Sequence, residues 1–410
     1  MRPSETNRER KTNKLFDIAY LNGSLFYDPY PIYAVLRDYT PVMWSKLKET
    51  WLITKYEDIE KGLRLPEITA KRTSIQASTL PDQLKQPLEA FYSGWLMYQE
   101  PPEHTRLRRT AQLLFSHSHL DKVSRNIEEY SRELIRQQLQ MEAIDIVAFG
   151  HLLGLRAVCY LLEIEPQNYG KIELWSQHIV DFMQGRYEDQ ILSGHIAATT
   201  ITNLTSYLRQ HIEFRSRYEN SVYSDFVRVS RTSHSASDDE LILLLANILM
   251  DGHEPIANAI ANAVVLLSNQ PNIFYQLKQN LDLLPDAVEE FLRMDPPFQY
   301  VVRYAGHDCR INGEFIAMGE RILFITASAN RDADVFPYPD TFDLRNNSKV
   351  HKTFGFGHHY CIGALLAKKV VGIALGCLIE NLPGVHLSNA VPLRHHSLGS
   401  RALNLLIIRI

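Results

Sequence analysis

The sequence lacks the cysteine patterns that mark disulfide-stapled domains and structural zinc sites. Its four cysteines form no C-x-x-C pair and no cysteine-dense segment; they are Cys159, Cys309, Cys361 and Cys377. Neither a disulfide framework nor a tetrahedral zinc site is therefore indicated. Cysteines in this arrangement suit a reducing compartment, so we expect a cytoplasmic protein.

The chain also lacks a long apolar run. Its opening, MRPSETNRERKTNK, is polar and charged, with no apolar segment behind it. The apolar run LILLLANILM at 241–250 is much shorter than the roughly 20 residues that a membrane-spanning helix needs. We therefore expect neither a secretory signal nor a membrane anchor.

Charge of one sign is not in excess, and no internal boundary is visible. The 410 residues include 43 Lys and Arg against 47 Asp and Glu, a net charge of −4 that provides no basic field for nucleic acid. The chain has 45% hydrophobic residues and no repeat, low-complexity tract or flexible linker, so it can bury a large core. We expect a globular protein that does not bind nucleic acid, with a polar tail at 1–14 and a single domain over 15–410.

The spacing of apolar residues predicts a mainly α-helical fold with a minor β part. A hairpin is expected at 41–55, where β-forming residues flank a polar turn. The further expected elements are a helix at 120–139, a helix ending near Met294, strands within 300–327, an irregular stretch to about 353, a helix from 362 and a strand-like C-terminal tail.

The longest predicted helix begins after Ser237. Ser237 and Glu240 form a capping box, and the apolar run behind them continues to Asn269, just before Pro271. At 1.5 Å per residue this helix would be roughly 45–50 Å long. Pro255 lies in its middle, where proline has no N–H to donate and costs roughly 3 kcal/mol or more. Either other contacts compensate for this break, or the break is useful.

The segment FGFGHHYCIG at 354–363 places a cysteine directly before a predicted helix. Cys361 would lie near the positive end of the helix dipole and near unsatisfied N–H groups, and both favour a thiolate. The neighbouring glycines let the backbone approach a flat, bulky group, and nearby N–H groups would tune the sulfur as a metal ligand. A single intracellular cysteine is more often a small buried hydrophobe, so position alone leaves both interpretations open.

This segment closely resembles the haem-ligand loop of cytochrome P450 enzymes, whose pattern is F-G-x-G-x-H-x-C-x-G. All six specified positions match: Phe354, Gly355, Gly357, His359, Cys361 and Gly363. The resemblance implies a cytochrome P450 fold, a single large domain whose long central helix passes over haem b. It implies that Cys361 is the axial thiolate ligand, that Phe354 packs near the sulfur and that His359 points to a haem propionate.

Other segments agree with the family in order and separation. His104 and Arg108 lie four apart, hence on one face of a helix, and the resemblance assigns them to the anionic propionates. Arg303 matches a further propionate-binding arginine. Taken alone, the first pair would be an ordinary solvated basic face and Arg303 an ordinary surface residue.

The resemblance also covers a structural ion pair. Glu290 and Arg293 match the family's E-x-x-R pair, and the acceptors around it are expected in the irregular stretch at 329–346. The similarity extends from about residue 25 to the C-terminus and is strongest with the soluble bacterial branch.

The segment DGHEP at 251–255 aligns with the family's A-G-x-[DE]-T at the centre of the long helix. By that alignment, Gly252 keeps the helix thin where oxygen must fit, and Glu254 occupies the acidic position linked to proton delivery. Pro255 replaces the threonine, so it supplies no hydroxyl and cannot donate a backbone bond to the carbonyl of Asp251. Asp251 itself replaces Ala or Gly and adds a second carboxylate.

Three functions are compatible with this departure. The favoured one is a monooxygenase that inserts oxygen from O2 into an organic substrate by hydroxylation or epoxidation, in secondary metabolism, with protons supplied by substrate, water, or Asp251 and His253. The second is a peroxide-using or oxidative-coupling enzyme. The third is a non-catalytic haem-binding protein that recruits a partner, for which Cys361, Glu290 and Arg293 would be needed equally.

The resemblance implies a ferredoxin or flavodoxin-type electron donor and favours a monomer. Basic residues are expected on the proximal side, where they either dock an acidic donor or are ordinary solvated charges: Arg106, Arg109, Lys368 and Lys369. The substrate is expected to be a small or medium apolar or amphipathic molecule, free or bound to a carrier protein. Its expected walls lie at 71–98, 170–190, 247–255, 297–302 and 396–401, and include Trp95, Met97, Phe182, Met183, Phe298 and Tyr300.

Overall fold

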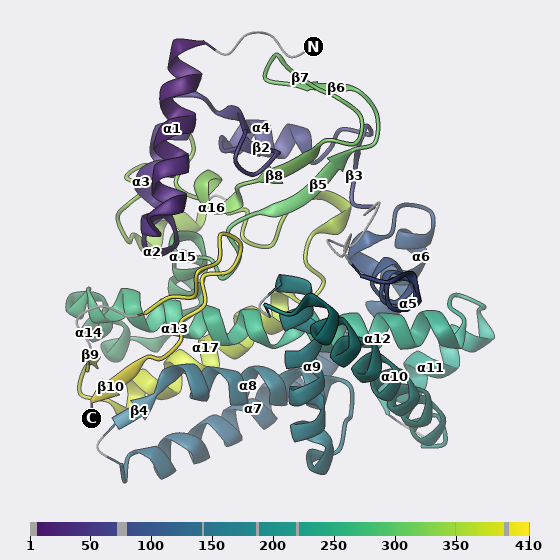
Figure 1. The fold of residues 1–410 in the computed structure, drawn as a ribbon. Helices are drawn as coiled ribbons and strands as arrows, with labels where there is room; N and C mark the ends of the chain where they lie inside the picture. Colours follow the sequence, from purple (N-terminus) through teal and green to yellow (C-terminus); the bar gives the residue numbers. More distant parts are fainter. Residues whose placement is uncertain are drawn as a thin grey trace. The chain divides into compact units, whose positions relative to one another are not determined.

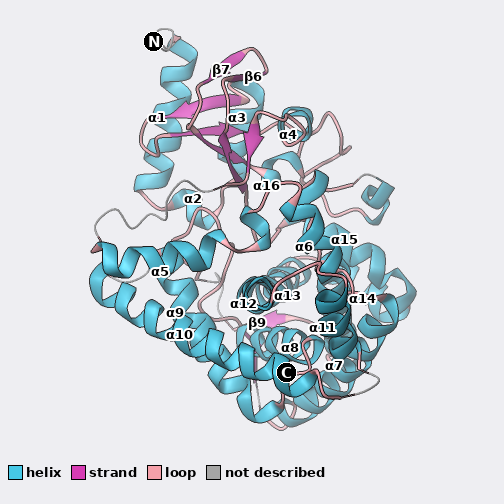
Figure 2. Cartoon of the chain, turned by 90° about the vertical axis from the view of Figure 1, so that its right-hand side faces the viewer, coloured by secondary structure: helices cyan, strands magenta, loops and turns pink. Residues whose placement is uncertain are grey.

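The computed structural model describes residues 6–71, 80–141, 143–185, 188–218, 221–348, 350–388 and 393–409. The chain divides into two compact units. The first comprises residues 1–69, 130–150 and 255–410, and the second comprises residues 70–129 and 151–254. Helices dominate, as predicted, and the strands within the described ranges all belong to the first unit (Figure 2).

A five-stranded sheet in the order β1-β2-β8-β5-β3 forms the centre of the N-terminal part of the first unit. Its strands are β1 (Val42–Ser45), β2 (Thr50–Ile53), β3 (Ile68–Thr69), β5 (Val301–Ala305) and β8 (Arg321–Phe324). β2 and β8 run parallel, whereas the other neighbours are antiparallel. The expected hairpin at 41–55 is β1 paired with β2.

Side chains on both faces of this sheet are buried. On β2, Trp51 and Ile53 pack with Ile59 on one side of the sheet, whereas Leu52 packs with Phe16 on the other. This alternation is the period of two that a strand imposes when both faces are covered. The covering helices near the sheet in Figure 1 are α1 (Asn7–Leu21), α2 (Ser24–Tyr27), α3 (Tyr30–Tyr39) and α4 (Tyr56–Gly62).

Helix α1 begins within the stretch that the sequence predicted as a polar tail. Thr6 caps the helix, and its side chain and that of Glu9 form a capping box. Thr12 and Asn13 are buried, so the expected boundary at residue 14 falls inside a packed helix.

The rest of the first unit is helical, with two small sheets. Its helices are α13 (Glu254–Ser268), α14 (Pro271–Gln279), α15 (Leu284–Met294), α16 (Thr326–Ala329) and α17 (Ala364–Asn381), with short 3₁₀ turns at Leu281–Leu283, Leu344–Ser348 and Gly357–His359. One small sheet joins β4 (Ala143–Asp145), β10 (Ile407–Arg409) and β9 (His386–Leu387), and the other joins β6 (Cys309–Ile311) and β7 (Glu314–Ile316). The helix expected to end near Met294 is α15, and the helix expected from 362 is α17, which begins at Ala364.

The second unit consists of helices. They are α5 (Asp82–Ser93), α6 (Glu103–Ala111), α9 (Tyr169–Gln184), α10 (Gln190–Arg215), α11 (Val222–Thr232) and α12 (Asp238–Gly252), with 3₁₀ turns at Leu96–Tyr98 and Pro166–Asn168. The chain passes between the units through α7 (His117–Gln138), which covers the predicted helix at 120–139, and α8 (Ile146–Leu161). Within the second unit, α10 packs against α5, α9 and α12.

The predicted single helix from Ser237 to Asn269 is wrong in one respect, because it is divided into α12 and α13. Ser237 caps α12 through the predicted capping box with Glu240. His253 separates the two helices, and α13 starts at Glu254. Pro255 therefore lies in the first turn of α13, where a backbone N–H has no intrahelical acceptor and its absence costs little.

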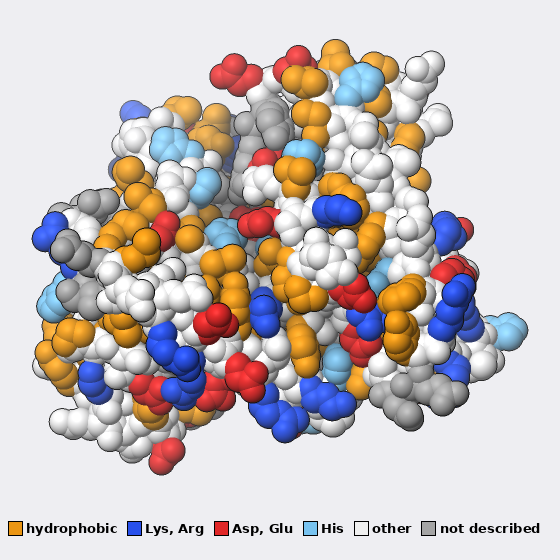
Figure 3. Space-filling view, turned by 90° about the horizontal axis from the view of Figure 1, so that it is seen from below, with side chains coloured by type: hydrophobic (Ala, Val, Ile, Leu, Met, Phe, Trp, Pro, Cys, Tyr) orange, Lys and Arg blue, Asp and Glu red, His pale blue; other side chains and the backbone are white. Residues whose placement is uncertain are grey.

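Two further features are the apolar length of the helices and the distribution of charge. Among the described residues, no helix is both long and apolar enough to cross a membrane. On the face drawn in Figure 3, Lys and Arg side chains lie among Asp and Glu side chains, so this face carries no extended field of one sign.

Candidate functional site

The loop before α17 presents Cys361 at the surface. Gly355 and Gly357 adopt φ values of +74° and +75°, a region that glycine occupies without the strain of a side chain. The backbone N–H of Cys361 donates to the carbonyl of Phe354 over 2.9 Å and closes the loop. Gly363 is the N-cap of α17. The Cys361 side chain is exposed, whereas the other three cysteines are buried, which selects Cys361 as the accessible thiol.

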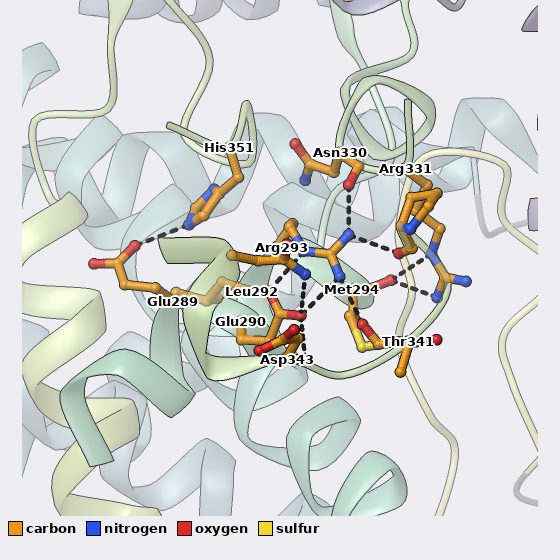
Figure 4. Close-up of polar contacts among 12 residues, drawn as sticks. Glu289, Glu290, Leu292, Arg293, Met294, Asn330, Arg331, Thr341, Asp343 and His351 are labelled. Atoms are coloured by element: carbon orange, nitrogen blue, oxygen red, sulfur yellow. Dashed lines mark hydrogen bonds and ion pairs between the residues drawn. The ribbon is translucent and has the colours of Figure 1, made fainter. Parts of the chain in front are cut away.

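Phe354 packs against aromatic and cationic neighbours within the first unit. Its ring centroid lies 5.9 Å from that of His351 and 6.2 Å from that of Tyr360, and the Lys368 ammonium lies 5.2 Å from it. Lys368 and His351 both contact Glu289 of α15, at 2.7 and 3.0 Å (the His351 contact is drawn in Figure 4). The loop is thereby tied to α15.

The tautomer of His351 follows from its contacts. Its Nδ1 accepts from the backbone N–H of Thr353, so in the neutral ring Nε2 carries the hydrogen that it donates to Glu289. Burial lowers the pKa of His351, partly offset by this carboxylate. Desolvation raises the pKa of Glu289, but hydrogen bonds from His351 and Lys368 lower it overall. We infer a neutral imidazole beside an ionised carboxylate.

Glu290 and Arg293 form the predicted buried ion pair on α15, with each side chain 1% exposed. Two parallel bonds join them: Nε to Oε2 at 2.6 Å and Nη2 to Oε1 at 2.8 Å (Figure 4). This bidentate geometry is the strong form of an Arg–carboxylate contact.

The acceptors and donors around this pair come from the irregular stretch, as expected for 329–346. Arg293 donates to backbone carbonyls; these belong to Asn330, Pro339 and Thr341. Glu290 accepts from the backbone N–H of Asp343 at 2.9 Å and from the Asn346 amide at 3.1 Å. The pair is therefore satisfied on all sides, and it fixes the chain that leads to the Cys361 loop.

Arg303 lies on β5, in the same unit as the loop. Its Nη1 donates to the carbonyl of Val302 over 2.7 Å. Val301, two residues earlier and so on the same face of the strand, lies 4.0 Å from the position that a Cβ at Gly355 would occupy. The structure thus brings Arg303 to the side of β5 that faces the loop containing His359 and Cys361.

His104 and Arg108 lie on α6 in the second unit. His104 is buried and Arg108 is partly buried, whereas Arg109, the next residue, is exposed. The predicted four-residue spacing therefore places both side chains on the less exposed face of α6. Asp251, Gly252 and Glu254 also belong to the second unit.

His253 replaces part of the helical hydrogen bonding at the break. Its Nδ1–H donates to the carbonyl of Leu249 over 2.9 Å, the acceptor that the backbone N–H of residue 253 would use in a regular helix. Its Nε2 then accepts from the hydroxyl of Ser176 on α9 at 3.2 Å. Burial lowers the pKa of His253, so the ring is neutral. Both nitrogens are engaged, and the expected role of His253 in proton supply stays a prediction.

Glycines on α8 and α12 allow these two helices to approach closely at the break. A Cβ at Gly154 would lie 2.5 Å from the carbonyl oxygen of His253. A Cβ at Gly252 would lie 2.8 Å from a methyl group of Val158. Packing against α8 is thus a sufficient reason for glycine at 252, and its expected role beside oxygen stays a prediction. The carboxylate of Asp251 accepts from the amide of Asn247, one turn earlier.

The structure modifies two surface expectations. Arg106 is engaged by Glu240 and the carbonyl of Ser235, and Lys368 by Glu289, so these two charges are partly neutralised and their expected role in docking is weakened.

Of the expected substrate walls, residues 72–79 and 186–187 lie outside the described residues. The aromatic wall candidates differ in exposure: Trp95 and Phe182 are buried, Met183 and Tyr300 are partly buried, and Met97 and Phe298 are exposed.

The donor set of the first unit fits haem iron. A thiol on a glycine loop before a helix N-terminus is a ligand that haem proteins use, and its electron donation is tuned by nearby N–H groups. Arg303 and His359 offer a cation and a ring that can donate hydrogen bonds to carboxylates.

Sequence reasoning missed the anchoring pair His351 and Glu289, although a histidine three residues before Phe354 and an acid beside the E-x-x-R pair were visible signals.

Three buried histidines predict a loss of stability in mild acid. The pKa values of His211, His253 and His351 are all lowered, with burial as the largest cause. Protons bind to these histidines more readily in the unfolded chain, where the histidine pKa is about 6.5. The stability they provide is therefore complete above that pH and decreases as pH falls toward the lowered values. We expect the thermal unfolding midpoint to decrease as the pH is lowered below about 6.5.

The variant His211→Gln separates this effect from general acid denaturation. Glutamine retains a donor for the carbonyl of Leu162, which His211 contacts over 2.9 Å, but it does not titrate. The slope of thermal midpoint against pH should become shallower in this variant and stay unchanged in His195→Gln, which alters an exposed histidine. Equal slopes in all three proteins would contradict the assignment.

Known proteins resemble the chain over most of its length. A family model described as cytochrome P450 matches residues 196–388. Mycinamicin IV hydroxylase/epoxidase of Micromonospora griseorubida is 30% identical over 83% of this chain and 84% of that protein. Vitamin D(3) 25-hydroxylase of Pseudonocardia autotrophica is 28% identical over 90% of this chain and 89% of that protein.

Solved structures share the fold. P450BioI, solved in complex with hexadec-9Z-enoic acid ligated acyl carrier protein, superposes with a TM-score of 0.86 at 24% identity, covering 94% of this chain and 99% of that one. The thiol loop, the buried E-x-x-R pair, the helical fold and these relatives agree. The chain belongs to the cytochrome P450 family of haem-iron oxidoreductases.

Proposed function

We propose that this P450 is a haem-thiolate monooxygenase that inserts one oxygen atom from O2 into a small or medium apolar or amphipathic substrate, by hydroxylation or epoxidation. The observation that carries the proposal is the exposed thiol of Cys361 on the closed glycine loop before α17. Haem b supplies oxygen activation when bound. The protein domain over residues 15–410 would bind and orient the substrate and deliver the protons.

Cys361 would hold the iron, with Phe354 beside the sulfur and Gly363 allowing the backbone to approach. Four further side chains would bind the propionates: His104, Arg108, Arg303 and His359. Arginine and imidazole donors suit carboxylates because charge-assisted hydrogen bonds are the stronger kind.

Proton delivery is assigned to Glu254 and Asp251. Pro255 cannot supply the hydroxyl that a threonine would offer. His253, which is hydrogen-bonded to Leu249 and Ser176, is a further candidate for this role. The amide of Asn247 orients Asp251, which supports a defined position for this acid near the helix break.

The substrate and partners follow from the relatives and the fold. The relatives named mycinamicin IV hydroxylase/epoxidase and vitamin D(3) 25-hydroxylase support an apolar substrate and a role in secondary metabolism. The neighbour bound to a fatty-acid-loaded carrier protein supports a carrier-bound substrate as one form. We propose a cytoplasmic monomer that receives electrons from a ferredoxin or flavodoxin through exposed basic residues that include Arg109.

A second candidate is a peroxide-using or oxidative-coupling P450, and Pro255 is the observation that favours it. Without a hydroxyl at position 255, the supply of protons to the site would depend on other groups, and a reaction that needs fewer protons avoids this requirement. A non-catalytic haem-binding protein would retain the same loop and ion pair. Product formation with electrons and O2 distinguishes an enzyme from the non-catalytic protein, and full turnover with peroxide alone identifies the peroxide-using candidate.

Exchange of the residues at the break tests the favoured function. Pro255→Thr should leave folding and the thiolate spectrum intact, because threonine is tolerated in helices at a cost below about 1 kcal/mol. Glu254→Gln and Asp251→Ala should lower product formed per electron and raise peroxide release. We expect a product loss of about a hundredfold for the more important acid, the lower range of what a positioned proton donor contributes.

The measurement is product and peroxide yield under identical electron supply. The unmutated protein given peroxide alone is the control. If neither carboxylate change alters these yields while peroxide supports full turnover, the peroxide-using candidate replaces the monooxygenase.

A further inference from the structure

Lys352 is a buried cation beside the thiol loop. It precedes Phe354 by two residues, and its side chain is 1% exposed. A buried ammonium is costly unless it is paired. Its Nζ lies 2.8 Å from Oε2 of Glu60 on α4 and 4.1 Å from the ring centroids of both Tyr56 and Phe356. One carboxylate and two ring faces therefore hold this charge.

Glu60 also holds a second cation against the same ring. Arg64 Nη2 lies 3.0 Å from Oε1 of Glu60, and the Arg64 guanidinium carbon lies 4.7 Å from the centroid of Phe356. Tyr56, Glu60 and Arg64 are four residues apart and so follow one face of α4 and its C-terminal turn. The Tyr56 hydroxyl donates to the carbonyl of Val350 over 2.8 Å. This face of α4 thus contacts the chain on both sides of Lys352.

The ring that the two cations contact belongs to the thiol loop. Phe356 is extended, with φ −155°, between Gly355 and Gly357, whose positive φ values permit conformations that other residues avoid. The backbone of Lys352 is fixed as well, because its carbonyl accepts from Gly355 over 2.9 Å and its N–H donates to the Asn330 side chain over 2.6 Å. The contacts with Lys352 and Arg64 therefore hold the Phe356 side chain, although the glycines on either side permit other backbone conformations.

From these contacts we propose that Lys352, Glu60 and Phe356 form a clamp that positions the loop carrying Cys361. They are positioning residues that act through the loop backbone. The inference rests on the proposed haem-thiolate function and adds which residues keep the ligand loop in its ligating geometry. When the clamp is removed, Cys361 itself is unchanged, but its thiolate stays bound to the iron for a shorter time.

Variants of the haem-loaded protein test the clamp. Lys352→Met removes the charge at similar volume, Phe356→Leu removes the ring, and Lys352→Arg keeps a cation. The matched control is Lys61→Met, because Lys61 lies on the same helix and pairs with Glu57 in full view of solvent, at 69% and 73% exposure. The readouts are the half-life of the thiolate-type spectrum of the ferrous carbon monoxide complex and the thermal unfolding midpoint.

Lys352→Met and Phe356→Leu should each shorten that half-life by about tenfold, the scale of a desolvated cation–π contact, while Lys61→Met leaves it unchanged. The double variant should lose little more than either single one, since both act on one contact. Lys352→Arg should restore most of the half-life. Glu60 is 30% exposed and keeps its second cation, Arg64, so Lys352→Met leaves no buried charge unpaired and the thermal midpoint should not fall in parallel.

The possible results separate the proposed function from the clamp. If the unmutated protein never gives a thiolate-type spectrum, the proposed function is wrong. If it gives that spectrum and the clamp variants decay at the unmutated rate, or if their half-lives merely follow the thermal midpoint, the clamp is wrong and the function stands.

Discussion

Cys361→Ala is expected to abolish the thiolate-type spectrum of the ferrous carbon monoxide complex together with all turnover. Cys361 is the exposed cysteine and the one at a helix N-terminus, so no second thiol is available at that loop. Because its side chain is exposed, truncation leaves no core cavity, and the haem-free chain should stay folded within about 0.5 kcal/mol. The haem-loaded protein should unfold at a lower temperature, since a ligand that binds less tightly stabilises the folded state less. Loss of the spectrum with an unchanged unfolding transition of the haem-free protein therefore reports loss of the ligand.

Cys377→Ala is the matched control for this variant. Cys377 lies on α17, the helix that follows the loop, and it is buried. Its replacement should lower stability modestly through lost packing and keep the spectrum. If the spectrum survives in Cys361→Ala, another residue binds the iron and the assignment of the loop is wrong.

Arg293→Met should produce the largest loss of stability. It leaves the carboxylate of Glu290, 1% exposed, without its cation and deprives backbone carbonyls of the irregular stretch of their donor. Breaking a buried pair from one side costs about 3–5 kcal/mol, a large part of the 5–15 kcal/mol that typically separates folded from unfolded protein. We expect little haem-loaded protein at 37 °C.

Urea or thermal unfolding measures this loss, and two variants make it specific. Arg345→Met removes an arginine from the same stretch, but its side chain is 88% exposed beside Asp343, so a change below about 1 kcal/mol is expected. Combining Arg293→Met with Glu290→Gln should recover part of the loss, since no buried charge remains. Equal destabilisation by Arg345→Met would show that the buried pair is unimportant.

The sequence predicted those features that local chemistry determines. Ser237 and Glu240 indicated the start of α12 because a capping box depends on four consecutive residues. The resemblance to the P450 family predicted the ion pair of Glu290 and Arg293, three apart on a helix, and placed its acceptors in the irregular stretch. The thiol loop was recognisable because all six specified residues of the family's haem-ligand pattern are present, whereas the position of Cys361 alone left both interpretations open.

The features that the sequence did not predict depend on distant contacts. One long helix was expected, yet the ring of His253 takes the carbonyl of Leu249 and contacts Ser176, which is 77 residues away. The clamp on the thiol loop requires Lys352 to meet Glu60, 292 residues earlier. Nothing within a short window of sequence distinguishes such a lysine from a solvated one, since its burial arises from the packing of α4.

The parallel pairing of β2 with β8 has a consequence for synthesis on the ribosome. The Thr50 hydroxyl donates to the carbonyl of Arg321, 271 residues later, so the N-terminal hairpin is made long before its neighbouring strand. At about 5–20 residues per second, the interval is roughly 14–54 s. During that time β2 exposes an unpaired edge and the apolar side chains of Trp51 and Ile53, which is the state in which nascent chains associate wrongly. Expression yield should therefore depend on chaperone supply and temperature more than on the stability of the finished fold.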